Sequence, residues 1–274
     1  YDDVTLARAV IIEPQKYLDI VAQNVSRLLQ NAGRFKQSAA ESSFDAWTKF
    51  YKQDASATNN IVSYYTKGGI IALGLDLLLR KQSNEQVNLD TLMQLLWKHY
   101  GVDEKGTPDD VIQNLCTTHF GIDVSEYLNS VVYGTDDVEL ASLVSEMGVN
   151  YAVRARVSGE DKGGASSLPA IKNQLGATLK PATFGLTVMQ VFEGLAAMKA
   201  GVLLNDVIIA LNGHIVNAQK LQRLLDNAQT SQVELTLIRD GRLLTLPLEV
   251  TQARKEMAYF EITDEEKLNQ WLGK

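Results

Sequence analysis

The hydrophobic pattern of this chain changes near Gly148, and that change limits the fold more than any other feature. Before it, apolar residues recur every three to four positions, the spacing of one helix face. After it, GVNYAVRARV at 148–157 and several later runs alternate apolar and polar residues, as half-buried strands do. The sequence therefore predicts a multi-domain α+β chain: an all-α subdomain at 1–148, a mainly β domain with a leading strand and loop at 149–252, and a helical tail at 253–274.

In the helical half, residues that typically begin or end a helix can be recognised. Pro14 fits the first position of a helix, and Gly33 can end it. The run that begins at Lys67, KGGIIALGLDLLLRK, is apolar almost all round and is predicted to lie inside its domain. Aromatic residues spaced at three and four positions predict a core-facing stripe: Phe44, Trp47 and Tyr51. In the β half, SGEDKGGASS at 158–167 predicts a flexible or exposed loop.

Composition excludes several classes of protein. The net charge is −7 and no basic cluster is visible, so we expect no nucleic-acid partner. No apolar stretch reaches the roughly 18 residues of a membrane span, since Asp76 interrupts IIALGLDLLL, and we expect no membrane anchor. The single Cys116 allows no intrachain disulfide, which leaves the cellular compartment open. His99 and His119 have no second ligand at a metal-binding spacing, so we predict no metal ligand in this chain.

The β half contains a specific motif, AGxxxxDxIxxxNG, at 200–213. We expect a positive φ at Asn205, where glycine is usual, and a hairpin turn at Asn212-Gly213. With the runs around it, from Gln174 to Val250, this motif resembles a PDZ domain of the bacterial, circularly permuted kind. Ala196 departs mildly from the pattern, because many such domains have proline there.

The PDZ resemblance implies a peptide site. In that family an extended peptide adds as a strand, and its terminal carboxylate binds a nest of backbone amides. The match places the nest at Leu175, Gly176 and Ala177. Two alternatives stay open: the site takes a peptide C-terminus, or it is empty or filled by the protein's own chain. Side chains cannot decide between them, because backbone forms the site.

The helical half resembles the C-terminal part of the catalytic domain of the glycyl aminopeptidase family, thermolysin-like zinc metallopeptidases that end in a PDZ domain. Four segments carry the resemblance: YDDVTLARAVI at 1–11, AGRFKQSAAESSFDAW at 32–47, SYYTKGG at 63–69 and LDLLLR at 75–80. In the family, an HExxH helix and a later Glu bind zinc upstream of the segment that matches YDDVTLARAVI. This chain has no HExxH. The resemblance thus implies a downstream fragment that holds no zinc and is inactive alone.

Related aminopeptidases use a YxKG motif whose tyrosine stabilises the tetrahedral intermediate. The match falls on Tyr65, Lys67 and Gly68, and Tyr64 is out of register. A phenol with a pKa near ~10 is a neutral donor at pH 7, so Tyr65 is predicted to donate to the oxyanion. The implied function of the parent is zinc-dependent removal of small N-terminal residues, Gly or Ala, from peptides. The alternatives are a PDZ-type peptide-binding module and a non-catalytic scaffold.

Overall fold

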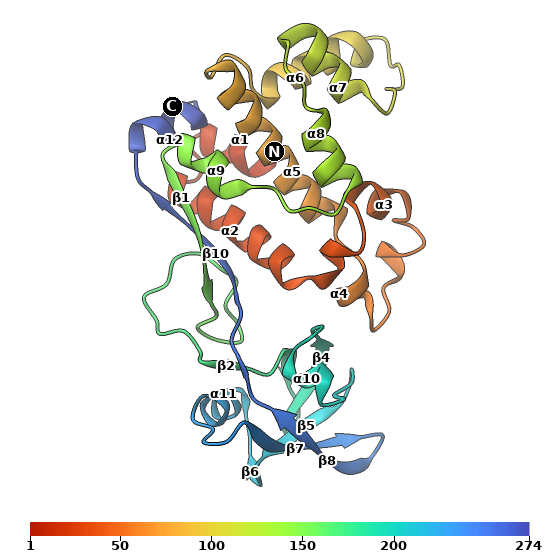
Figure 1. Ribbon diagram of the computed structural model, residues 1–274, viewed down its shortest axis with the longest axis vertical. Helices are drawn as coiled ribbons and strands as arrows, with labels where there is room; N and C mark the ends of the chain where they lie inside the picture. Colours follow the sequence, from red (N-terminus) through yellow and green to blue (C-terminus); the bar gives the residue numbers. More distant parts are fainter. Residues whose placement is uncertain (274) are drawn as a thin grey trace.

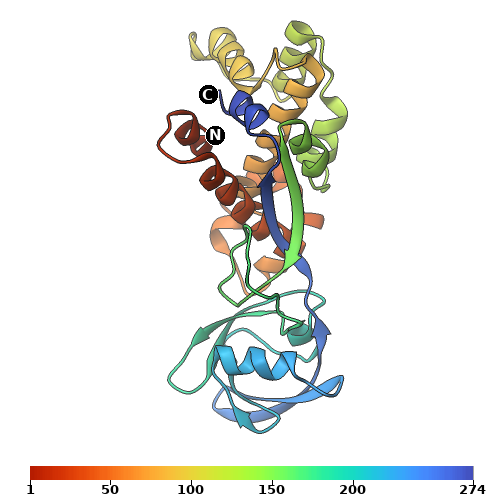
Figure 2. The ribbon, with the colours of Figure 1, turned by 90° about the vertical axis from the view of Figure 1, so that its left-hand side faces the viewer.

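Two bodies lie end to end along the long axis of the molecule, a helical body and a β domain joined by a two-stranded ribbon (Figure 1, Figure 2). The structure is a computed structural model that describes residues 1–273. It confirms the predicted fold class. The helices of the helical body are α1 (Asp2–Arg8), α2 (Pro14–Gln30), α3 (Ala39–Phe44), α4 (Ala57–Asn60), α5 (Tyr64–Ser83), α6 (Leu89–Leu96), α7 (Val111–Leu115), α8 (Ser125–Leu128) and α9 (Leu140–Glu146). Short π-helical turns extend α6, α7 and α8: Trp97–Gly101, Cys116–Phe120 and Asn129–Tyr133.

Helix α5 is the central helix of this body, as its all-round apolar pattern predicts. It begins at Tyr64 and not at Lys67, because Ser63 caps it: the Ser63 Oγ accepts the Thr66 N–H at 3.2 Å. The run Ala57–Ser83, which spans α4 and α5, passes a length-and-composition test for a membrane span, contrary to our expectation from Asp76. In the structure α5 packs against α2, α3, α6 and α9.

The end of the chain returns to the helical body. Helix α12 (Glu265–Leu272) starts at Asp264, whose Oδ1 accepts the N–H groups of Glu266 and Lys267 at 3.1 and 3.2 Å. Trp271 is buried there, with its ring 5.8 Å from that of Tyr17, and its Nε1 donates to the Asp76 Oδ2 at 3.2 Å. The helical core is therefore completed by the last residues of the chain.

The strand predicted to lead the β domain belongs to the helical body instead. β1 (Val149–Ala155) pairs antiparallel with β10 (Lys255–Ile262), and β10 packs on α2. The Ser26 Oγ on α2 accepts the buried Ala258 N–H at 2.8 Å and donates to the Ala22 carbonyl at 2.7 Å. The expected leading strand thus pairs outside the domain predicted at 149–252, and the helical tail predicted at 253–274 contains β10 before its helix, because a strand needs a partner and this one comes from the far end of the chain.

The β domain has the sheet order β3-β4-β5-β7-β8, with α11 (Ala218–Asp226) packed on it (Figure 1). The strands are β3 (Ala177–Pro181), β4 (Leu186–Val191), β5 (Val207–Leu211), β7 (Gln232–Arg239) and β8 (Arg242–Glu249). β6 (His214–Ile215) pairs with β5, β2 (Asn173–Gln174) pairs with β9 (Thr251–Gln252), and α10 (Ala196–Lys199) follows β4. The expected turns are confirmed, with φ of +69° at Asn205, +47° at Asn212 and +73° at Gly213.

One local prediction is wrong. Phe44, Trp47 and Tyr51 are exposed by 91%, 78% and 50%, not buried, because α3 ends at Phe44 and the chain then turns. The loop 158–167 is largely exposed, as predicted, but Gly164 is buried and hydrogen bonds hold the turn that leads to it. Asp161 accepts the N–H groups of Val157 and Gly163 at 2.9 and 3.0 Å, and the Gly164 N–H donates to the Ala258 carbonyl at 2.8 Å.

Candidate functional site

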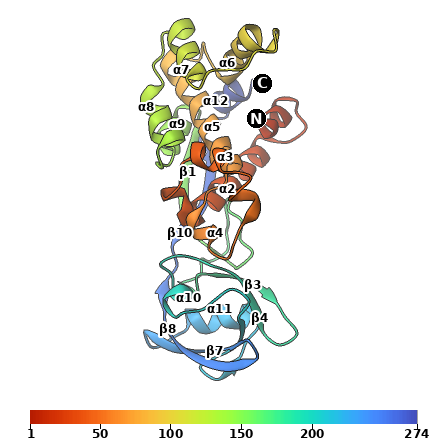
Figure 3. The ribbon, with the colours of Figure 1, turned by 90° about the vertical axis from the view of Figure 1, so that its right-hand side faces the viewer.

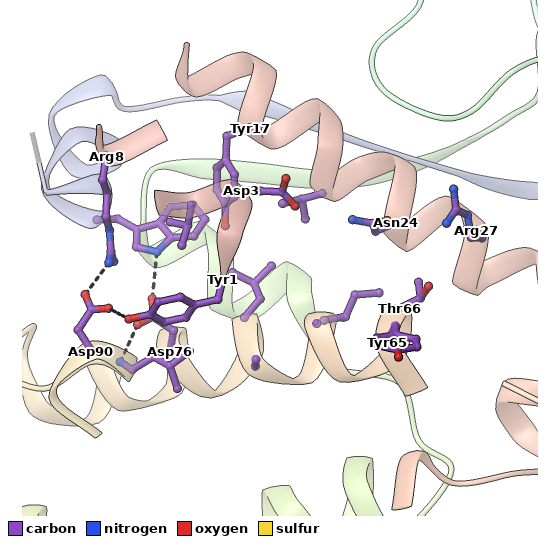
Figure 4. Close-up of a pocket in the computed structure, with 18 residues that line it drawn as sticks. Tyr1, Asp3, Arg8, Tyr17, Asn24, Arg27, Tyr65, Thr66, Asp76 and Asp90 are labelled. Atoms are coloured by element: carbon purple, nitrogen blue, oxygen red, sulfur yellow. Dashed lines mark hydrogen bonds and ion pairs between the residues drawn. The ribbon is translucent and has the colours of Figure 1, made fainter. Parts of the chain in front are cut away.

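A cavity of about 300 Å³ lies between α1 and α2 on one side and α5 on the other (Figure 4). At one end, the hydroxyl of Tyr1 donates to Asp90, which also pairs with Arg8. At the other end, α5 contributes Tyr65, Thr66 and Gly69 from its first two turns. The YxKG tyrosine therefore stands at the edge of a hollow that could admit part of a peptide.

Tyr65 differs from Tyr64 in its surroundings. Tyr65 lines the cavity and is 61% exposed, whereas Tyr64 is half-buried and does not line it. The two rings lie 4.2 Å apart, and both hydroxyls hydrogen-bond the Tyr51 hydroxyl, at 2.8 Å for Tyr65 and 3.1 Å for Tyr64. Hydrogen bonding to Tyr51, the larger cause, and to Tyr64 lowers the pKa of Tyr65. Hydrogen bonding to Tyr51, and then to Tyr65, raises the pKa of Tyr64.

Lys67 of the motif points away from the cavity. It is 2% exposed, and its Nζ donates to the carbonyl oxygens of Arg34 at 3.3 Å and Thr135 at 3.1 Å. Burial lowers the pKa of Lys67, and nearby Asp137 and Asp136 oppose that shift. Lys67 thus links the first turn of α5 to the segments that contain Arg34 and Thr135. A Cβ at Gly68 would meet no atom within 4 Å, so packing within residues 1–273 does not explain that glycine.

The described residues supply no zinc site. No group of three or more His, Cys, Asp or Glu side chains in residues 1–273 is placed to hold a metal ion. The structure does bring His99 and His119 together, with ring centroids 5.1 Å apart, although both are exposed. Sequence spacing could not reveal this pair, because its members come from two separate helices.

The predicted amide nest lies where β2 leads into β3. Gly176 has a φ of +81°, and a Cβ there would stand 2.2 Å from the Leu195 Cβ, so glycine is required. Its carbonyl accepts the Phe192 N–H at 2.9 Å, and the Leu175 carbonyl accepts the Ala197 N–H at 2.7 Å. Neither the Leu175 N–H nor the Gly176 N–H donates to an acceptor within the described chain. Both residues are buried, and their two amides are donors without an acceptor in residues 1–273, as an anion-binding nest requires.

The edge strand beside the nest is also free. β3 pairs with β4 on one side, and no strand of residues 1–273 pairs with its other edge. The sequence left open whether the protein's own chain fills the peptide site. Within residues 1–273, no strand of the chain covers the free edge of β3. The arrangement can accept an added strand with its carboxylate at the nest.

Comparison with known proteins bears on both bodies. Residues 1–71 match the family model of the M61 glycyl aminopeptidases, and residues 173–250 match that of the PDZ domain. Residues 1–71 are thus similar to M61 glycyl aminopeptidases, and residues 173–250 are similar to PDZ domains. It is also similar to the crystal structure of an aminopeptidase N family protein from Idiomarina loihiensis, at 35% identity and a TM-score of 0.94. That match covers 99% of this chain but 46% of the other, so the chain spans less than half the length of this relative.

A second relative matches a smaller part of this chain. A probable periplasmic serine endoprotease DegP-like protein from Chlamydia pneumoniae is 35% identical over 97 residues, which are 30% of this chain and 20% of that protein. The M61 segment contains Tyr65 and ends at residue 71, inside α5. The family match thus includes the YxKG motif, while the role of Tyr65 stays a prediction.

Proposed function

We propose that this chain is part of a zinc-dependent aminopeptidase that removes small N-terminal residues, such as Gly or Ala, from peptides. The M61 match and the similarity to an aminopeptidase N family protein support a peptidase-related function. Because residues 1–273 offer no zinc ligand set, the metal of the parent protein would be held by other residues, and this chain alone is expected to be inactive.

The observation that carries the proposal is the place of Tyr65 in the cavity. Tyr65 lines the cavity, and its hydroxyl, a neutral donor, hydrogen-bonds the Tyr51 hydroxyl at 2.8 Å. In peptide hydrolysis the scissile carbonyl oxygen gains negative charge in the transition state, and a positioned donor stabilises that charge. The Tyr65 proton is shared in a hydrogen bond with that oxygen and is not transferred.

The test replaces Tyr65 by Phe in the full-length parent protein and measures turnover of a glycyl p-nitroanilide. Losing one oxyanion donor costs on the order of 10²-fold in kcat. Tyr64→Phe is the matched control, because it removes the neighbouring hydroxyl from the same hydrogen-bond network. Near wild-type turnover for Tyr65→Phe would remove Tyr65 from the mechanism.

A second function is favoured by a separate observation, the two unbonded amides beside the free edge of β3. We propose that the PDZ domain binds the C-terminus of a peptide there. The experiment titrates the whole chain with a fluorescent decapeptide that ends in an apolar residue, and with the same peptide amidated at its C-terminus. Binding of the free acid and much weaker binding of the amide is expected; equal binding of both would exclude the nest as the carboxylate site.

A further inference from the structure

The side chain of Asn59 connects the two bodies. Asn59 lies in α4, at the end of the helical body that faces the β domain (Figure 1, Figure 3). Its Nδ2 donates to the Val191 carbonyl at 2.8 Å, and its Oδ1 accepts the Glu193 N–H at 2.9 Å. A carboxamide carries the same donor and acceptor as a peptide group, so Asn59 pairs with β4 as a strand residue would. It is 6% exposed, which shields both bonds from water.

These bonds enclose one residue that holds the amide nest. Phe192 lies between Val191 and Glu193, and its N–H donates to the Gly176 carbonyl at 2.9 Å. Val191 is also the register partner of Ala177, the last residue of the nest. The conformation of the nest and the conformation of residues 191–193, to which Asn59 is hydrogen-bonded, therefore depend on each other.

On the other side, Asn59 is tied to the start of α5. The chain from α4 to Tyr64 is fixed at Val62, whose N–H donates to the Gln37 Oε1 at 3.1 Å and whose carbonyl accepts the Ser42 hydroxyl at 2.5 Å. Both Gln37 and Ser42 are buried. The bonds of Asn59 and of Val62 thus act together on the short segment that leads into Tyr64 and Tyr65.

We infer that Asn59 is a positioning residue that couples peptide binding at the nest to the segment carrying Tyr65. A carboxylate bound by the Leu175 and Gly176 amides fixes the nest, Phe192 and the Asn59 pairing together. This restrains residues 57–66. The inference rests on the PDZ peptide binding proposed above, and it requires by linkage that loss of Asn59 weakens peptide binding.

The experiment follows hydrogen exchange of the whole chain with and without a saturating decapeptide that ends in an apolar residue and a free carboxylate. Peptide is expected to slow exchange of the amides in 57–66 in the wild type. In Asn59→Ala this slowing is lost, and the peptide binds more weakly by about fivefold or more, the lower end of typical coupling. Asn60→Ala is the matched control, because the exposed Asn60 accepts from Lys36 and donates to the Ser56 carbonyl, both at 3.3 Å, and makes no bond to β4 itself. Lys36 keeps its ion pair with Glu193 in both variants.

The outcomes separate the two proposals. If the peptide binds the wild type and exchange in 57–66 is unchanged, the coupling is overturned and PDZ binding stands. If no peptide binds, PDZ binding fails, and the coupling fails with it. The wild-type comparison needs no variant to fold, and Asn59→Asp, which keeps the size and removes the donor to Val191, repeats the variant arm. Slowing that survives in a folded Asn59→Asp protein also contradicts the inference.

Discussion

Replacing Lys67 by Met separates the structural residue of the YxKG motif from the residue that we place at the reaction. In the native protein Lys67 donates two bonds, to the Arg34 and Thr135 carbonyls, from a side chain that is 2% exposed. Bonds from a charged donor contribute about 1.5–3 kcal/mol each, so their loss alone would cost about 3–6 kcal/mol. Met keeps the volume and removes the burial cost of an ammonium group, which is several kcal/mol in itself. The expected net loss is on the order of 2 kcal/mol, toward the range typical of single substitutions.

The assay for Lys67→Met is urea unfolding of the chain, followed by far-UV circular dichroism. We expect a lower midpoint at an unchanged slope. In the parent enzyme the variant should lose activity only in proportion to its unfolded fraction. A stable Lys67→Met protein that has lost turnover as severely as Tyr65→Phe would refute the structural role of Lys67.

The same variant has a pH signature. The pKa of Lys67 is lowered from 10.5 by burial, so between its folded value and 10.5 the unfolded chain binds more protons than the folded one. The free energy of unfolding contributed by Lys67 therefore rises as pH rises through that window. The difference in unfolding free energy between wild type and Lys67→Met should increase over this range. A flat difference would contradict the burial that the structure gives Lys67.

Two further predictions concern stability. Asp206 is 1% exposed in its side chain; burial opposes its ionisation, but the Arg239 guanidinium, at 2.7 Å, and the Leu203 N–H lower its pKa overall. The β domain should therefore lose stability as pH falls through the lowered pKa of Asp206. In Asp206→Asn this loss of stability at low pH should disappear. If the variant unfolds in acid as the wild type does, the Asp206–Arg239 ion pair is not the cause. Ser26→Ala leaves the buried Ala258 N–H without its acceptor, which should destabilise the helical body by about 1–3 kcal/mol, while Ser145→Ala at an exposed site changes little. Equal midpoints in urea for the two variants would count against the α2–β10 contact.

Local conformation was predictable from the sequence where a single short segment determines it. Asn212-Gly213 and Asn205 take the expected positive φ because the need is set by the turn itself. The apolar run of α5 predicts an interior helix for the same reason, since every side of it must be covered. The start of α5 was misplaced because Ser63 caps the helix at Tyr64, before the apolar run begins.

Features that depend on distant pairing were not predictable. β1 alternates like any strand, and nothing within it reveals that β10, about a hundred positions later, is its partner. Phe44, Trp47 and Tyr51 have helical spacing, but α3 ends before that spacing can form a face. Asn59 lies in the short helix α4, and nothing in the sequence around it indicates the two bonds that it makes to the β domain. The position predicted for the nest follows from the family pattern and not from its side chains, and its role in binding stays a prediction.

The most direct test of the account is the turnover of the full-length parent carrying Tyr65→Phe, compared with Tyr64→Phe, on a glycyl p-nitroanilide at pH 7. Tyr65 lines the cavity and Tyr64 does not, so the account predicts a fall in kcat on the order of 10²-fold for Tyr65→Phe and little change for Tyr64→Phe. Unchanged turnover in Tyr65→Phe, or an equal fall in both variants, would contradict the central claim that the Tyr65 hydroxyl binds the developing oxyanion.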